Sequence, residues 1–92
     1  MISISAQVSL YPLGQEELST AIDEALNIFR RHNLMLAPGS MSTIISGDDD
    51  VVFSALQEAF QRATVAGRVV MVTTFSNACP PIQPDENQRG GL

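Results

Sequence analysis

Five polar side chains alternate along the first stretch of the chain and carry the groups that could contact a small molecule. They are Ser3, Ser5, Gln7, Ser9 and Tyr11, and the residues between them are the apolar Ile2, Ile4, Ala6, Val8 and Leu10. Because the side chains of a β-strand alternate between its two faces, the apolar set predicts a buried face and the polar set the opposite face. Hydroxyl and amide groups form hydrogen bonds without carrying charge. We therefore expect the polar face to meet something other than water.

The other potentially reactive side chains have structural explanations. Asp48, Asp49 and Asp50 follow a glycine where a helix is predicted to begin, and negative charge is favourable there. They lack the alternate spacing and the distant Glu of a calcium loop. His32 stands alone at a predicted helix end, and Cys79 has no second Cys with which to pair. The sequence therefore predicts no metal site, no cofactor and no catalytic residue.

Composition limits the class of protein. The chain of 92 residues is 45% hydrophobic and only 16% charged, which is apolar for one small domain and favours an oligomer. The net charge is -5, Lys is absent, and the five Arg do not form a broad patch, so nucleic acid and anionic membrane surfaces are unlikely partners. The N-terminal alternation differs from a signal peptide, and no segment has membrane-spanning length, so we expect a cytoplasmic protein.

The order of predicted elements indicates the fold. After the first strand, residues 15–33 change to a helical period, and two strands follow at about Leu34 to Ala37 and Met41 to Ser46. A second helix runs from about residue 48 to residue 67, and residues 68–76 form a last strand. Strand, helix, strand, strand, helix, strand is the pattern of a ferredoxin-like α+β sandwich, with a four-stranded antiparallel sheet and two helices on one face. We expect this domain to cover residues 1–76, and residues 77–92 to form a flexible tail.

The helical period also predicts which side chains are buried. The first helix would bury Leu18, Ile22, Ala25, Leu26 and Phe29, and the second would bury Val52, Phe53, Leu56, Phe60 and Ala63. The first and third strands would lie in the middle of the sheet. The face with Ser9 and Tyr11 would then be open and shared with Thr43 or its neighbours, and Met41 and Phe75 would add apolar walls if they lie on that face.

Two motifs resemble a known family. Val8 to Gly14, with the sequence VSLYPLG, and Gly39 to Asp48, with the sequence GSMSTIISGD, resemble the thiamine-binding protein family of small ferredoxin-like domains. The similarity extends over about Ile2 to Thr74. It implies binding of thiamine or its hydroxymethylpyrimidine part without catalysis, and assembly as dimers or tetramers through the sheets. In place of an acidic residue common in the first strand of the family, this chain has Gln7.

The candidate ligand site follows from the residues and from this resemblance. An aminopyrimidine is flat and has donors and acceptors, so it needs apolar walls and a few polar groups. Ser9, Tyr11, Thr43 and Gln7 are of the right kinds, and Met41 is a candidate wall. The diphosphate ester would need a cluster of cations or a glycine-rich loop, which the sequence lacks. Two alternatives are an oligomerisation module that binds no small molecule and, with less support, a small enzyme that uses the same face.

Overall fold

The computed structural model describes residues 3–14, 19–39 and 42–78. Its elements are β1 (Ser3–Pro12), α1 (Ser19–Arg31), β2 (Met35–Pro38), β3 (Thr43–Asp48), α2 (Asp49–Thr64) and β4 (Val69–Ser76). The strands form one antiparallel sheet in the order β2-β3-β1-β4, which confirms the ferredoxin-like α+β fold and the central position of the first and third strands. Met41 and residues 79–92, with Cys79 and most of the expected tail, lie outside the described residues.

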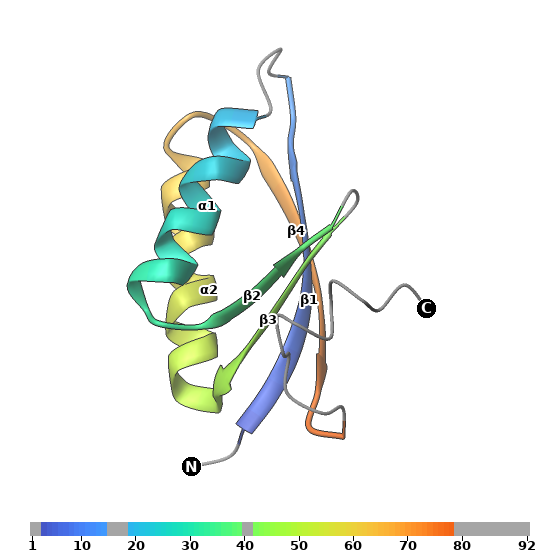
Figure 1. Ribbon diagram of the computed structural model, residues 1–92. Coiled ribbons are helices and arrows are strands. Elements are labelled where there is room, and N and C mark those ends of the chain that lie inside the picture. The colour runs from blue at the N-terminus through green and yellow to red at the C-terminus, as the bar shows by residue number, and fades with distance from the viewer. Residues whose placement is uncertain (1–2, 15–18, 40–41, 79–92) are drawn as a thin grey trace.

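Both helices lie on the same face of the sheet (Figure 1). The core between the two layers contains Phe29 from α1, Ile45 from β3 and Val52 from α2, which are the largest fully buried side chains. From β1, Ala6 and Val8 are buried against them, as the period of two predicts. We call the face of the sheet away from the helices the open face.

The end of α1 agrees with the sequence. Asn33 has a φ of 60°, which is the left-handed conformation expected of it. Its N–H donates to the carbonyl of Arg30 at 2.9 Å, and the N–H of Leu34 donates to the carbonyl of Phe29 at 3.3 Å. These two bonds form a Schellman motif, which satisfies carbonyl groups that the helix leaves unpaired.

The start of α2 agrees in position but not in detail. Asp48 occupies the N-cap position, yet its side chain makes no capping hydrogen bond. Instead, the Asp49 and Asp50 carboxylates accept hydrogen bonds from the N–H groups of Asp50 and Val51, each at 2.9 Å. Negative charge still lies at the positive end of the helix dipole, so the acidic residues serve α2 as expected.

The predicted buried stripe of α2 was wrong at its two aromatic positions. Phe53 and Phe60 are 53% and 40% exposed. The buried stripe consists of Val52, Ala55, Leu56, Ala59 and Ala63. Because three of these five side chains are methyl groups, the helix can pack close to its neighbours, and the phenyl rings project beyond that layer.

The stripe of α1 was predicted correctly at Ala25 and Phe29, which are buried. Ile28 is also buried although the pattern did not select it, while Ile22 is 40% exposed. Leu18 lies outside the described residues. The buried side of α1 is therefore rotated slightly toward α2 relative to the prediction.

Candidate functional site

Strand register assigns each candidate residue to a face of the sheet. Paired residues of antiparallel strands direct their side chains to the same face. Gln7 pairs with Ile44 of β3 and with Thr74 of β4, and these three lie on the open face. Thr43 pairs with Val8, which is buried under the helices, so Thr43 lies on the helix side. The open face therefore receives the neighbours of Thr43 and not Thr43 itself.

The open face is polar along β1 and apolar beside it. Gln7 donates a hydrogen bond from Nε2 to Ser42 Oγ at 3.0 Å, and the Ser5 and Ser46 hydroxyls lie 3.0 Å apart. Large apolar side chains flank this row and are about 40 to 50% exposed: Tyr11 at 49%, Ile44 at 39%, Val70 at 44% and Val72 at 53%. So much exposed apolar surface on one small sheet is typical of an interface.

A cleft with a volume of about 100 Å³ opens between α1 and the sheet, and we call it the α1 cleft. Its lining residues are Val8, Ser9 and Leu10 of β1, Ile22, Ala25, Leu26 and Phe29 of α1, and Gly39, Ser42 and Thr43 around the turn of the β2–β3 hairpin. Apolar side chains of α1 thus form one wall, and the strands form the other. No charged side chain is among these lining residues.

Thr43 is the lining residue that directs a hydroxyl group to the helix side. Ser9 pairs with Val72 on the open face, so we infer that its main chain, and not its hydroxyl, borders the cleft. The turn beside Thr43 is fixed by a hydrogen bond from the Gly39 N–H to the Ser42 carbonyl at 2.8 Å. In the part of the cleft that the structure describes, apolar walls are therefore combined with the hydroxyl of Thr43 and with main-chain groups.

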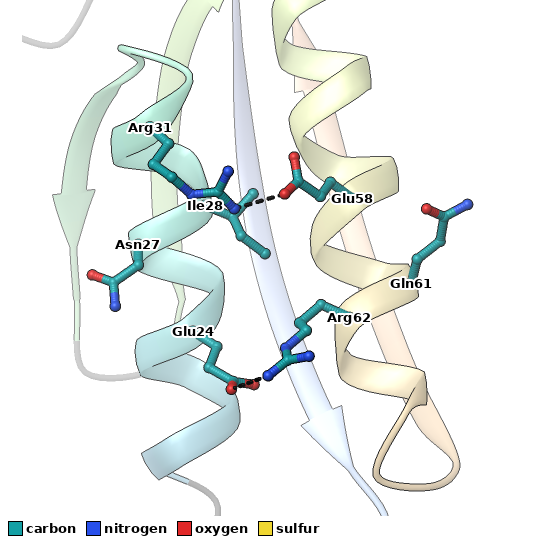
Figure 2. A pocket seen from close by; sticks show the side chains of 7 residues that line it. All are labelled: Glu24, Asn27, Ile28, Arg31, Glu58, Gln61 and Arg62. Carbon is teal, nitrogen blue, oxygen red and sulfur yellow. Dashed lines mark hydrogen bonds and ion pairs between the residues drawn. The ribbon is translucent and has the colours of Figure 1, made fainter.

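A wider hollow of about 440 Å³, the interhelix groove, lies between α1 and α2 on the outer side of the helices (Figure 2). Two ion pairs bridge it: Arg31 Nη2 lies 2.6 Å from Glu58 Oε2, and Arg62 Nη2 lies 3.0 Å from Glu24 Oε2. Because each cation has an acidic partner, the groove presents no net charge to a ligand. We interpret these pairs as ties between the helices.

Glu58 is also bound by His32, whose Nε2 lies 2.8 Å from Glu58 Oε1. The carboxylate only accepts hydrogen bonds, so the ring N–H donates. This bond, and next the bond from Arg31, hold the pKa of the Glu58 carboxyl below its usual value of 4.5. His32 therefore helps to tie α1 to α2. Within residues 3–14, 19–39 and 42–78 no group of three His, Cys, Asp or Glu side chains could hold a metal ion.

The structure divides the candidate residues between two places. Ser9 and Thr43 both border the α1 cleft, whereas Gln7 and Tyr11 lie on the open face, and Met41 is outside the described residues. Phe75 is on the helix side, where its ring stacks on Phe53 with the centroids 4.7 Å apart. Sequence reasoning missed the contribution of α1 to the cleft. The apolar stripe of α1 was the available signal, but it was assigned entirely to the core.

No helix in the described part of the chain has the length and apolar character needed to cross a membrane.

Comparison with known proteins agrees with this architecture. The chain is 32% identical over 60 residues to the UPF0045 protein MJ1052 of Methanocaldococcus jannaschii, and the matched segment covers 64% of this chain and 60% of that relative. The crystal structure of the hypothetical protein MJ1052 superposes over 100% of both chains with a TM-score of 0.82 and 26% identity.

A crystal structure from Thermotoga maritima is similar in fold. That protein, which has a suggested role in thiamine biosynthesis or salvage, is 14% identical, with 96% of this chain and 97% of that chain covered and a TM-score of 0.77. At this identity the likeness shows the fold alone. The sequence profile that describes the YKOF-related family matches residues 3–82, nearly the whole chain. This protein is therefore a member of the YKOF-related family.

Proposed function

We propose that the chain is a non-enzymatic cytoplasmic carrier or sensor that binds thiamine or its hydroxymethylpyrimidine part. The sequence suggested a pocket on the open face near a subunit interface. The orientation of Thr43 now favours the α1 cleft, because the cleft joins a hydroxyl group to apolar walls on two sides. This juxtaposition of Thr43 with the α1 side chains is the observation on which the proposal rests.

The chemistry of the cleft suits an aminopyrimidine ring. The flat ring would lie against the apolar side chains of Leu26 and Ile22, while Thr43 and the main chain near Gly39 would offer a donor and acceptors. These groups bind and orient a molecule. We assign none of the described lining residues as a general acid or base and propose binding without catalysis.

The size of the cleft favours the pyrimidine part over the whole vitamin. Its volume of about 100 Å³ is small beside the roughly 300 to 1,000 Å³ of pockets that enclose drug-sized ligands. It would hold one ring and leave the thiazolium of thiamine outside. The net charge of -5 attracts this cation weakly and opposes a diphosphate, so we expect thiamine diphosphate to bind least.

Support for this ligand class comes from two further sources. The motifs with Tyr11 and Thr43 resemble those of thiamine-binding proteins, and a protein of the same fold has a suggested role in thiamine biosynthesis or salvage. Neither source identifies the ligand of this chain.

Isothermal titration calorimetry with hydroxymethylpyrimidine, thiamine and thiamine diphosphate tests the proposal. We expect binding of the first two, and a ligand at a hundred times its dissociation constant should add about 2.7 kcal/mol to the free energy of unfolding. Thr43→Val keeps the shape of the side chain and removes the hydroxyl, so it should weaken binding roughly three- to tenfold.

Thr73→Val is the matched control for this experiment. Thr73 also pairs with Val8 on the helix side, but from β4, and it is not among the residues that line the α1 cleft. The control variant should bind as the wild type does. Absence of heat and of thermal stabilisation with both hydroxymethylpyrimidine and thiamine would show the proposed function to be wrong.

The second candidate function is a structural oligomerisation module. The exposed apolar side chains of the open face, Ile44 and Val72 among them, favour a homodimer or homotetramer in which a second copy covers this face. Ile44→Lys would then reduce the assembly state measured by light scattering. If the wild-type protein assembles but none of the three compounds stabilises it, this candidate replaces the first.

A further inference from the structure

A shallow hollow lies on the helix side of the sheet, where β1 begins and β4 ends. It has a volume of about 430 Å³, and its lining residues are Ile4, Asp49, Phe53, Phe75, Ser76 and Asn77. Phe53 of α2 and Phe75 of β4 stack there with their ring centroids 4.7 Å apart, yet they are 53% and 43% exposed. Ile4 packs against the hydrophobic core. The hollow is therefore an apolar continuation of the core that remains partly exposed.

The chain passes the edge of this hollow as it leaves β4. Ser76, the last residue of β4, and Asn77 both line the hollow. The N–H of Ala78 donates a hydrogen bond to Ser76 Oγ at 3.0 Å, which forms a turn directly after the strand. The segment that follows Ala78 therefore starts at the edge of the hollow.

The sequence of this following segment suits an aromatic surface. Residues 79–84 are CPPIQP, so two consecutive prolines and an isoleucine precede the first charged residue, Asp85. Consecutive prolines favour the extended polyproline II conformation, which binds to aromatic-lined grooves because it is already ordered and loses little entropy. Four residues in this conformation span about 12 Å. That length is sufficient to cross two rings whose centroids are 4.7 Å apart.

The family match extends into the same segment. The profile of the YKOF-related family matches residues 3–82, so it continues past the end of β4 at Ser76 and reaches Ile82. The two prolines and the isoleucine thus fall within the region that the family profile describes. This extent favours a structural role for residues 80–82 over that of an unrelated extension.

We propose that residues 80–82, the Pro-Pro-Ile segment, dock in the hollow of their own chain. Ile82 then covers the stacked rings of Phe53 and Phe75 and removes part of their surface from water. Docking within one chain is favoured because the segment starts at the edge of the hollow, so its local concentration there is high. The proposal concerns this hollow alone and is independent of the ligand of the α1 cleft.

NMR spectroscopy of the full-length chain with isotope-labelled isoleucine methyl groups tests the proposal. A methyl group held over the face of an aromatic ring resonates upfield of its usual position. We therefore expect an upfield shift of the Ile82 methyl signals and NOEs from them to the rings of Phe53 and Phe75. Phe53→Leu should reduce the upfield shift. Phe60→Leu is the matched control, because Phe60 is also an exposed ring of α2 but is not among the residues that line the hollow.

Thermal unfolding provides a second readout. Ile82→Ser should lower the Tm by roughly 4 to 8 °C, since a domain of this size responds with such a shift to the loss of one aliphatic contact. Leu92→Ser is the matched control, because Leu92 is the other aliphatic residue of the sequence after Ala78. This control should leave the Tm unchanged. Both positions follow β4, so neither change disturbs a described strand or helix.

The proposal would be overturned by Ile82 methyl signals at their usual position, or by equal Tm values of Ile82→Ser and the wild type. A mixed sample of labelled and unlabelled chains identifies the source of the contact. NOEs within the labelled chain support docking of the chain on itself. NOEs that occur only between a labelled and an unlabelled chain would show that a second copy fills the hollow, and this result would also overturn the proposal.

Discussion

Arg31 and Glu58 connect the two helices through a contact of 2.6 Å between Nη2 and Oε2 (Figure 2). The same carboxylate accepts a hydrogen bond from His32, so one residue of α2 holds two consecutive residues at the end of α1. Both donors stabilise the ionised form of Glu58 and lower its pKa in the folded state.

This contact predicts how stability depends on pH. Because the folded-state pKa of Glu58 is lowered, the stabilisation is fully present above the usual value of 4.5 and is lost as pH falls through the lower folded value. Glu58→Gln should therefore be less stable than the wild type at neutral pH, and the difference should shrink in acid. Urea unfolding at several pH values measures it. A difference that stays constant with pH would contradict the assignment.

Replacing Asn33 by most other residues should lower the stability of the fold, because Asn tolerates the left-handed backbone conformation better than they do. Its φ of 60° is unfavourable for a residue with an ordinary side chain. We expect Asn33→Ala to lower the free energy of unfolding by about 1 kcal/mol, and Asn33→Gly to keep or raise it. Asn27→Ala, within the regular part of α1, is the control and should change stability by less than about 0.5 kcal/mol. Equal effects of Ala at the two positions would refute the explanation.

Gly47 should not accept a larger residue. A Cβ atom at this position would lie 2.5 Å from Leu34 Cδ2, and Leu34 is a buried side chain. Gly47→Ala should cost about 1 to 3 kcal/mol of stability through overpacking. In the double variant Gly47→Ala, Leu34→Ala the clash is absent, so the loss should be smaller than the sum of the two single losses. Strict additivity in thermal unfolding would show that the clash does not occur.

Ser5 and Ser46 should behave as a coupled pair. Their hydroxyls are 3.0 Å apart, and the two residues are only 8% and 3% exposed. Replacing either one by Ala leaves the other hydroxyl without this partner, which should cost about 1 kcal/mol. The double variant should cost less than the sum, because both hydroxyls are then absent. A double-mutant cycle in urea provides the coupling energy, and a coupling of zero would argue against the bond.

The spacing of apolar residues along the sequence was sufficient to predict the order of the elements and the two faces of β1. It failed for β3, because each face of that strand carries an isoleucine beside a hydroxyl, and no amphipathic contrast decides which face is buried. Only the pairing of Thr43 with Val8 settles the matter. As a result, the sequence named Thr43 as a candidate but could not place it in a cleft with α1.

The wrong prediction that Phe53 and Phe60 of α2 are buried has a similar cause. The positions of Phe53 and Phe60 and the positions of Ala55 and Ala59 both fit a helical stripe that contains Val52, and the larger rings were preferred as core residues. The structure buries the alanines, whose small side chains let α2 pack close to its neighbours. Side-chain volume, and not hydrophobicity, decided which stripe faces the sheet.

Phe29 belongs both to the core and to the α1 cleft. Its side chain is 2% exposed at the centre of the core and also forms part of the wall of the cleft. A ring that occupied the cleft would extend the layer of contacts that keeps α1 on the sheet. An empty cleft would then go with a loosened first helix, and under the proposed function the concentration of the ligand would determine how long the chain resists proteolysis.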